Sequence, residues 1–207
     1  MFIGSDYSRA QELLEAIQFF NQRGWSPATS TNYSVRTLNP KNYIISRSGV
    51  DKSKFTINDL IVINSQAEIQ APYNLVGVKS SAETGIHTAI YEQFPEINCV
   101  FHTHSPLATV LSMQYEKEGR IVFDGYELLK ALDGIGTHHT NTVLPIVPNS
   151  QDMAEILGNM KGRWEGVHGF LISGHGLYTW GKDIPTTKRH VEAFEFLFEC
   201  HMIQRRF

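Results

Sequence analysis

The 207-residue chain lacks several features that would mark a specialised class of protein. It has two cysteines, Cys99 and Cys200, so no disulfide framework forms, and we expect both thiols to be buried in a reducing cytoplasm. The net charge is −3 and no basic run occurs, which argues against a nucleic-acid or anionic-membrane partner. There is no signal-peptide layout and no apolar run long enough to span a bilayer. We therefore expect a cytoplasmic protein, in which a local phosphate pocket remains compatible with the charge.

The chain is long enough to bury one sizeable core, so we expect a single domain over residues 1–207. Helix-like and strand-like segments are interspersed, which favours a sheet covered by helices. The early strands lie too close together in sequence for helical crossovers, so some of them must pair antiparallel. The predicted fold class is α/β, with a mixed, largely antiparallel sheet between helical layers.

Hydrophobic periodicity and turn residues give the predicted boundaries. The predicted helices cover about 8–23, 82–94, 106–113, 151–160 and 185–202, with a short helical piece at 127–132. The predicted strands cover 33–35, 43–46, 59–63, 97–104, 143–147 and 169–173, with 177–180 as a hairpin partner. Residues 116–141 are otherwise expected to be rich in loops.

The strongest chemical signal is the pair His102 and His104 at the end of an apolar strand-like run. Alternate residues of a strand project to the same face, so both imidazoles can reach one metal ion. A catalytic zinc site typically uses three protein ligands, and His175 is the best third because Gly174 and Gly176 leave space around its ring. The alternative is that His-x-His is only a polar strand face.

Other histidines are weaker candidates. His138 and His139 are a rival source of ligands, although neighbours on an extended chain point to opposite faces, so at most one of them can join the site. The remaining four lack a comparable setting and are interpreted as surface or packing residues: His87, His168, His190 and His201.

Glu83 lies at the predicted start of a helix, where Ser80 or Ser81 can act as a cap. The free N–H groups of a helix start favour anions, so Ser81 is a candidate phosphate ligand and Glu83 a candidate metal-site carboxylate. The alternative is a capping arrangement without catalytic meaning. Three further candidates for substrate or phosphate binding lie in loops that offer hydroxyl, amide and backbone donors: Asn32, Ser48 and Gly49.

Glu127 carries no distinctive local pattern. By its sequence context it is an ordinary solvated glutamate, three residues before Lys130 and therefore able to pair with it on a helix.

Taken together and in order, these segments resemble the class II aldolase/adducin-like family. The resemblance covers most of the chain, and the ordered set is more specific than any member: 32–36, 48–50, 81–84 with His87, 102–105 and 174–176. Two further segments, 126–130 and 175–181, are most similar to a methionine-salvage branch of dehydratases, which remove water from a phosphorylated 2-ketose.

The resemblance implies a three-layer α/β/α fold and one zinc ion per subunit on His102, His104 and His175. It also implies a small phosphorylated ketose as substrate and a cyclic homotetramer with active sites at subunit interfaces. It makes Glu127 the expected general acid/base. Glu83 is a metal-site glutamate and base in the family's aldolases, whereas some dehydratases carry another residue there.

Two alternatives share this metal site. A sugar-phosphate aldolase or 4-epimerase would need the same ligands, and the chain's end at 205–207, without a tyrosine-bearing tail, argues against the fuculose type. A non-catalytic adducin-like binding module would not need three histidines. One departure from the family pattern concerns phosphate binding, because the loop before Asn32 is Ala28–Thr31 and contains no glycine.

Overall fold

The computed structural model describes residues 2–204, and its centre is a sheet of eight strands in the order β3-β2-β1-β4-β8-β7-β6-β5. Within these residues β6 and β7 run parallel, and the other neighbouring strands are antiparallel. The strands are β1 (Asn32–Arg36), β2 (Asn42–Ser46), β3 (Leu60–Asn64), β4 (Cys99–Thr103), β5 (Arg120–Asp124), β6 (Asn141–Val147), β7 (Gly169–Ile172) and β8 (Gly176–Gly181).

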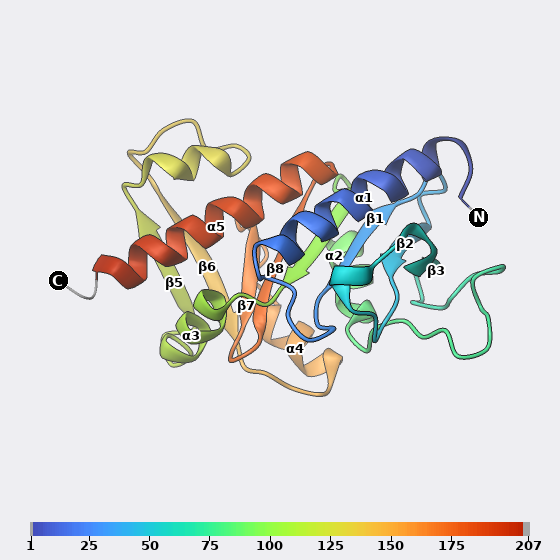
Figure 1. The fold of residues 1–207 in the computed structure, drawn as a ribbon. Helices are drawn as coiled ribbons and strands as arrows, with labels where there is room; N and C mark the ends of the chain where they lie inside the picture. The colour runs from blue at the N-terminus through green and yellow to red at the C-terminus, as the bar shows by residue number, and fades with distance from the viewer. Residues whose placement is uncertain (1, 205–207) are drawn as a thin grey trace.

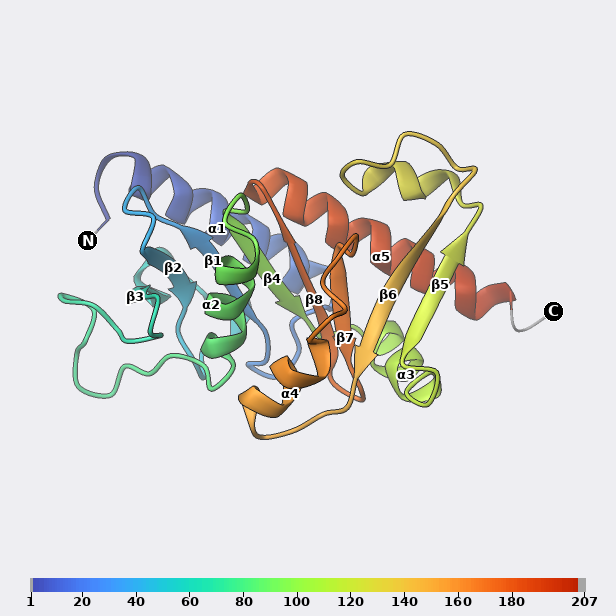
Figure 2. The same ribbon diagram turned by 180° about the vertical axis from the view of Figure 1, so that it is seen from behind.

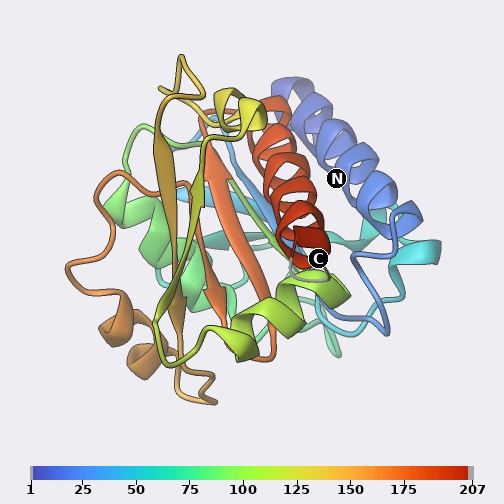
Figure 3. The same cartoon turned by 90° about the vertical axis from the view of Figure 1, so that its left-hand side faces the viewer.

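Helices cover both faces of this sheet. The helices are α1 (Gly4–Gln22), α2 (Thr84–Gln93), α3 (Pro106–Gln114), α4 (Met153–Met160) and α5 (Ile184–Gln204), with short 3-10 helices η1 (Lys52–Lys54), η2 (Ile57–Asp59) and η3 (Glu127–Ala131). The long helices α1 and α5 lie on one face (Figure 1), and α2 and α4 lie on the other (Figure 2). Seen along the sheet, the three layers are separate (Figure 3). The predicted three-layer α/β/α arrangement is confirmed.

The sequence of β4 explains why it occupies the middle of the sheet. All five of its residues are buried, as expected for a strand covered on both faces. Cys99 and Phe101 pack into the cluster that includes α1, whereas Val100 packs with α2 and α4 on the other side. Full burial of a side chain such as Phe101 stabilises the fold by ~1.5–3 kcal/mol. His102 continues the Val100 side of the strand, so it faces the α2 layer.

The strand registers define two ends of the sheet. At one end, Thr103 pairs with Leu177, Ile172 with Gly176 and Val147 with Ile172; we call this the histidine end. At the other end, Asp124 pairs with Asn141; we call this the distal end. The segment between β5 and β6, which contains η3, therefore lies at the distal end, as Figures 1 and 2 both show.

The structure corrects some predicted boundaries. Residues 116–141, predicted to be rich in loops, contain β5, in which exposed and buried residues alternate. The predicted helix 82–94 begins at Thr84, with Glu83 rather than a serine at its N-cap. No helix within residues 2–204 is long and apolar enough to cross a membrane. The chain end at 205–207 lies outside the described residues.

Candidate active site

The histidine end brings three imidazoles together. His102 and His104 leave β4 on the same side, and their Nε2 atoms are 2.7 Å apart. The Nε2 atom of His175 is 3.3 Å from that of His102. One ligand atom from each of the three rings lies within 4.8 Å of the others. Ser105 then caps α3 by accepting a hydrogen bond from the Ala108 N–H at 3.0 Å.

The turn between β7 and β8 holds His175, and its glycines are required by geometry. Gly174 has φ +64°, a left-handed conformation that other residues rarely adopt. A Cβ atom on Gly176 would lie 2.2 Å from the Thr103 carbonyl oxygen and 3.1 Å from the rings of both His102 and His104. Only glycine at this position lets β8 approach β4 closely enough to place the third imidazole beside the first two.

The protonation pattern fits a metal ion. The Nδ1–H of His102 donates to the Leu177 carbonyl oxygen at 3.0 Å, which leaves the lone pair of Nε2 facing the cluster. Burial lowers the pKa of His102 well below its ordinary value and that of His104 to about 4. Both rings are therefore neutral near pH 7. Converging neutral imidazoles are the donor set that zinc and similar divalent ions bind.

Glu83 faces the same centre. Its Oε1 is 2.9 Å from His175 Nε2, and its Oε2 is 3.5 Å from His102 Nε2. Asn32 Nδ2 and the Tyr178 hydroxyl donate to Oε2 at 2.6 and 3.2 Å. Burial acts to raise the pKa of Glu83, but the hydrogen bond with His175, the electrostatic interaction with the neighbouring imidazoles and the hydrogen bond from Asn32 hold it well below its usual range. The carboxylate is therefore held ionised and fixed.

A buried hydrogen-bond chain supports Glu83 from behind. His87 donates from Nε2 to the Asn32 side-chain oxygen, because the Asn32 amide nitrogen already donates to Glu83. The Ser34 hydroxyl then donates to His87 Nδ1 at 2.7 Å and accepts from the Tyr91 hydroxyl at 2.9 Å. Burial lowers the pKa of His87 to about 3, so the ring stays neutral and the chain keeps one direction. His87, interpreted from sequence as a packing residue, thus positions Asn32.

A polar cavity of about 260 Å³ opens beside the histidines. Three of the predicted phosphate residues, Asn32, Ser48 and Ser81, line it, and Gly49 adjoins Ser48 with φ +74°. The remaining lining residues are Thr29, Ser30, Thr31, Ser46, Arg47, Ala82, Glu83 and His104. Hydroxyl groups and a cation make this cavity suitable for a phosphate group.

Two basic side chains near this cavity were missed at the sequence level. Arg47 lines the cavity and pairs with Asp59 at 2.6 Å. Lys52 is 1% exposed, and burial lowers its pKa to about 8. The charge of Lys52 also lowers the pKa of His104, which places positive potential beside the site. Arg47 immediately precedes Ser48 and Gly49, so its position offered a signal, whereas the burial of Lys52 is a tertiary effect.

The loop before Asn32 adopts glycine-like backbone angles without glycine. Ala28, Thr29 and Thr31 have φ values of +51°, +62° and +74°. The Thr31 hydroxyl is buried and has no hydrogen-bond partner among the described residues. A left-handed conformation costs a non-glycine residue ~1–2 kcal/mol, so the rest of the site must hold the loop in place.

Glu127 is not part of this constellation within one chain. Its side chain is 67% exposed, and its carboxylate contacts Lys130 and, at 3.1 Å, His138. The hydrogen bond from Lys130 lowers its pKa. The seven-residue strand β6 runs from the distal end to the histidine end, a span of about 20 Å at ~3.3 Å per residue. His138, a rival metal ligand, lies beside Glu127 and not beside His102.

Comparison with known proteins agrees with these features. Residues 11–202 match the family described as Class II Aldolase and Adducin N-terminal domain, and the chain belongs to this family. A methylthioribulose-1-phosphate dehydratase from Sorangium cellulosum is 42% identical over 200 residues, covering 95% of this chain and 92% of that protein. One from Methylococcus capsulatus is 44% identical over 195 residues, covering 93% and 92%. One from Hahella chejuensis is 44% identical over 202 residues, covering 96% and 94%.

Solved structures share the fold at lower identity. An L-fuculose 1-phosphate aldolase aligns with a TM-score of 0.78 at 17% identity, covering 97% of this chain and 87% of that one. An aldolase II superfamily protein from Pseudomonas syringae aligns with a TM-score of 0.79 at 17% identity, covering 99% of this chain and 79% of that one. These structures confirm the predicted aldolase-like architecture.

Proposed function

We propose that this protein is a metal-dependent hydro-lyase that dehydrates 5-methylthioribulose 1-phosphate to 2,3-diketo-5-methylthiopentyl 1-phosphate in methionine salvage. The observation that best supports this proposal is the convergence of three imidazoles and an ionised glutamate beside a hydroxyl-lined cavity. The dehydratase assignment is supported by relatives of that name, which are 42–44% identical over more than nine-tenths of the chain. We regard residues 1–207 as one domain and the enzyme as cytoplasmic.

In this proposal one zinc ion per subunit is held by His102, His104 and His175. Bound there, it would supply Lewis-acid polarisation of the ketose carbonyl, which acidifies the neighbouring C3–H. Glu83 keeps its charge at the site because Asn32 and Tyr178 donate hydrogen bonds to it. We assign Glu83 to tuning the metal centre. Its four close polar contacts leave it poorly placed to carry a proton through the reaction.

The substrate phosphate would lie in the cavity lined by Asn32, Ser48 and Ser81, and Gly49 follows Ser48 directly in the chain. Arg47 adds a cation at the same place. The Thr31 hydroxyl, which has no hydrogen-bond partner in the part of the chain that the structure describes, is available as a further donor. This arrangement fixes one end of the ketose, so its C2–C4 region can reach the histidine end.

Glu127 is our candidate for proton transfer. Its carboxylate would take the C3 proton and return it to the departing C4 hydroxyl, so that one water molecule leaves and the enol product tautomerises to the diketone. Because Glu127 lies at the distal end of its own chain, we propose that it acts in the site of a neighbouring copy. The assembly is then a cyclic homotetramer with active sites between subunits.

Exposed apolar residues at both ends of the sheet support a head-to-tail contact. At the distal end Phe196 is 49% exposed in a shallow apolar hollow that Glu127 and Leu128 also line. At the histidine end Met113 is 62% exposed and lies close to Gly174, the residue before His175. Contact between unlike surfaces closes into a ring when the rotation is right.

The test is incubation of the zinc-loaded protein with 5-methylthioribulose 1-phosphate, followed by product analysis. The proposal predicts the diketone phosphate. Retro-aldol fragments would identify an aldolase, a C4 epimer would identify an epimerase, and an unchanged substrate with full zinc occupancy would favour a binding module. Glu127→Gln should fold and retain zinc but lose turnover. Near-normal turnover would remove Glu127 from the mechanism.

A further inference from the structure

Asp133, the second residue after η3, is held by all three of its polar groups. Its backbone N–H donates to His190 Nε2 at 3.1 Å. Its carbonyl oxygen accepts from His168 Nε2 at 2.6 Å. Its carboxylate accepts from Arg189. Three side chains from outside the η3 loop therefore converge on one partly exposed loop residue, an arrangement that a freely solvated loop does not need.

Hydrogen bonds fix the tautomer of each histidine in this cluster. His190 is 2% exposed and donates from Nδ1 to the Trp180 carbonyl oxygen at 2.8 Å. A neutral ring then has only Nε2 left as an acceptor, which is the atom that receives the Asp133 N–H. The Thr179 hydroxyl donates to the His168 backbone carbonyl at 2.6 Å, which ties that residue to β8 as well. The anchor therefore rests on the rigid part of the sheet.

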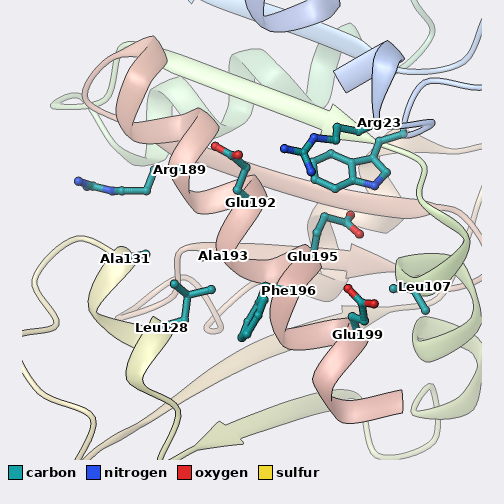
Figure 4. Close-up of a pocket in the computed structure, with 11 residues that line it drawn as sticks. Arg23, Leu107, Leu128, Ala131, Arg189, Glu192, Ala193, Glu195, Phe196 and Glu199 are labelled. Carbon is teal, nitrogen blue, oxygen red and sulfur yellow. The ribbon is translucent and has the colours of Figure 1, made fainter. Parts of the chain in front are cut away.

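Packing alone holds η3 less firmly than the hydrogen bonds hold Asp133. A cavity of about 360 Å³ separates part of η3 from α5, with Leu128 and Ala131 on one side and Ala193 and Phe196 on the other (Figure 4). Only Leu129 and the following Leu132 are fully buried in this stretch. A short helix beside a cavity can shift, because voids remove the contacts that would hold it.

We propose that His190, His168 and Arg189 are positioning residues that act through Asp133 to fix the segment carrying Glu127. The inference rests on the proposed function, in which Glu127 transfers the proton. Glu127 is exposed, and a misplacement of ~1 Å can lower turnover by about a hundredfold. The same loop turns back at His138, which contacts Glu127 at 3.1 Å. Fixing Asp133 thus fixes both Glu127 and one of its contacts.

The test compares His190→Leu with His190→Gln and with Val191→Ala. Leucine keeps most of the volume but removes both hydrogen bonds, whereas glutamine can again donate to Trp180 and accept from Asp133. Val191 is also fully buried on α5 but packs in the cluster with α1, so its truncation is a matched control for lost stability. Hydrogen exchange of residues 126–138, kcat, KM and zinc content are measured for each protein.

The proposal predicts that His190→Leu speeds exchange of this segment and lowers kcat at least about tenfold, with KM and zinc content near wild type. His190→Gln should restore most of the slow exchange and most of the wild-type kcat. Val191→Ala should change neither the exchange rate of this segment nor kcat. Unchanged exchange in His190→Leu, or faster exchange with normal kcat while Glu127→Gln is inactive, would overturn the proposal.

A second variant guards against loss of folding in His190→Leu. Arg189 has a half-exposed side chain, so Arg189→Ala should fold, and Lys188→Ala is its control because Lys188 lies over the Phe19 ring instead. Arg189→Ala should lower kcat and speed exchange of residues 126–138, and Lys188→Ala should not. Equal behaviour of the two would contradict the proposal. If wild type makes no diketone, the proposed function fails, and the exchange data still decide whether the anchor holds the segment.

Discussion

The two ends of the sheet hold their chemical groups in opposite ways. At the histidine end, both carboxylate oxygens of Glu83 have partners in the same chain, and His102 is fully buried. At the distal end, Glu127 is two-thirds exposed, and within residues 2–204 its carboxylate contacts only Lys130 and His138. The difference indicates that one chain preorganises the candidate metal centre by itself, whereas in our proposal the candidate acid/base acts against a surface of another copy.

Removal of a histidine should have the largest effect and be confined to the histidine end. His175→Ala leaves two imidazoles, so zinc content should fall strongly and turnover by about a thousandfold or more. Elemental analysis of the purified protein checks this, with His138→Ala as the control that should keep its metal. Full zinc occupancy in His175→Ala would contradict the role of His175 as the third ligand.

Gly176→Ala should destabilise the histidine end by forcing two backbone segments apart. The added Cβ would lie 2.2 Å from the Thr103 carbonyl oxygen, so β4 and β8 must separate. We expect a loss of about 3 kcal/mol or more in the free energy of unfolding, measured by denaturant titration. The control is Gly136→Ala, because a Cβ there meets nothing within 4 Å. Equal stabilities of the two variants would contradict the close approach of the strands.

Glu195 extends the comparison of carboxyl groups, because it is buried like Glu83 but lacks comparable hydrogen-bond partners among the described residues. It is 4% exposed, and neither oxygen has a hydrogen-bond partner among the described residues. Burial raises its pKa to about 8. Between about pH 4.5 and 8 the folded protein therefore holds a proton that the unfolded chain releases, so stability falls as pH rises.

Glu195→Gln removes this dependence. Relative to wild type, its free energy of unfolding should increase by ~1.4 kcal/mol per pH unit across that window, as measured by denaturant titration at several pH values. Below pH 4.5 the difference should be constant. A pH-independent difference throughout would mean that Glu195 is ionised in the folded protein.

The smallest effect is expected at the strained loop of the histidine end. Thr29→Gly relieves the left-handed conformation at φ +62° but gives the unfolded chain more freedom, so the net gain should be about 0.5 kcal/mol. Thr29→Ala is the control, because it removes the side chain and keeps the backbone penalty. Thermal unfolding of both variants checks the order, and a glycine variant less stable than the alanine variant would contradict it.

Local patterns predicted much of the histidine end. The period of two in a strand placed His102 and His104 together, and the glycines around His175 marked a close approach. The role of His87 as support for Asn32 could not be predicted, because it depends on the packing of α2 against β1. The alternation of Ile121 and Phe123 did offer a signal for β5, but in a segment otherwise rich in polar and loop-forming residues.

The place of Glu127 was beyond sequence reasoning for a different reason. Its distance from the histidines follows from the registers of β4, β8, β7 and β6. The β4–β8 and β6–β7 pairings join residues far apart in the sequence, whereas β7 and β8 form a local hairpin. No local pattern encodes which end of a sheet a loop will reach. The resemblance to the family suggested a catalytic role, and the topology adds that one chain alone does not bring Glu127 to the cluster.

The most direct test of the account is complementation between His175→Ala and Glu127→Gln. Each variant alone should be inactive. Subunits unfolded and refolded together at equal amounts should recover about a quarter of wild-type turnover, because random mixing pairs an intact histidine cluster with an intact neighbouring Glu127 at that frequency. His102→Ala mixed with His175→Ala should recover none. No recovery in the first mixture, with mixed assemblies demonstrated by mass, would contradict the claim that the site is completed by a second copy.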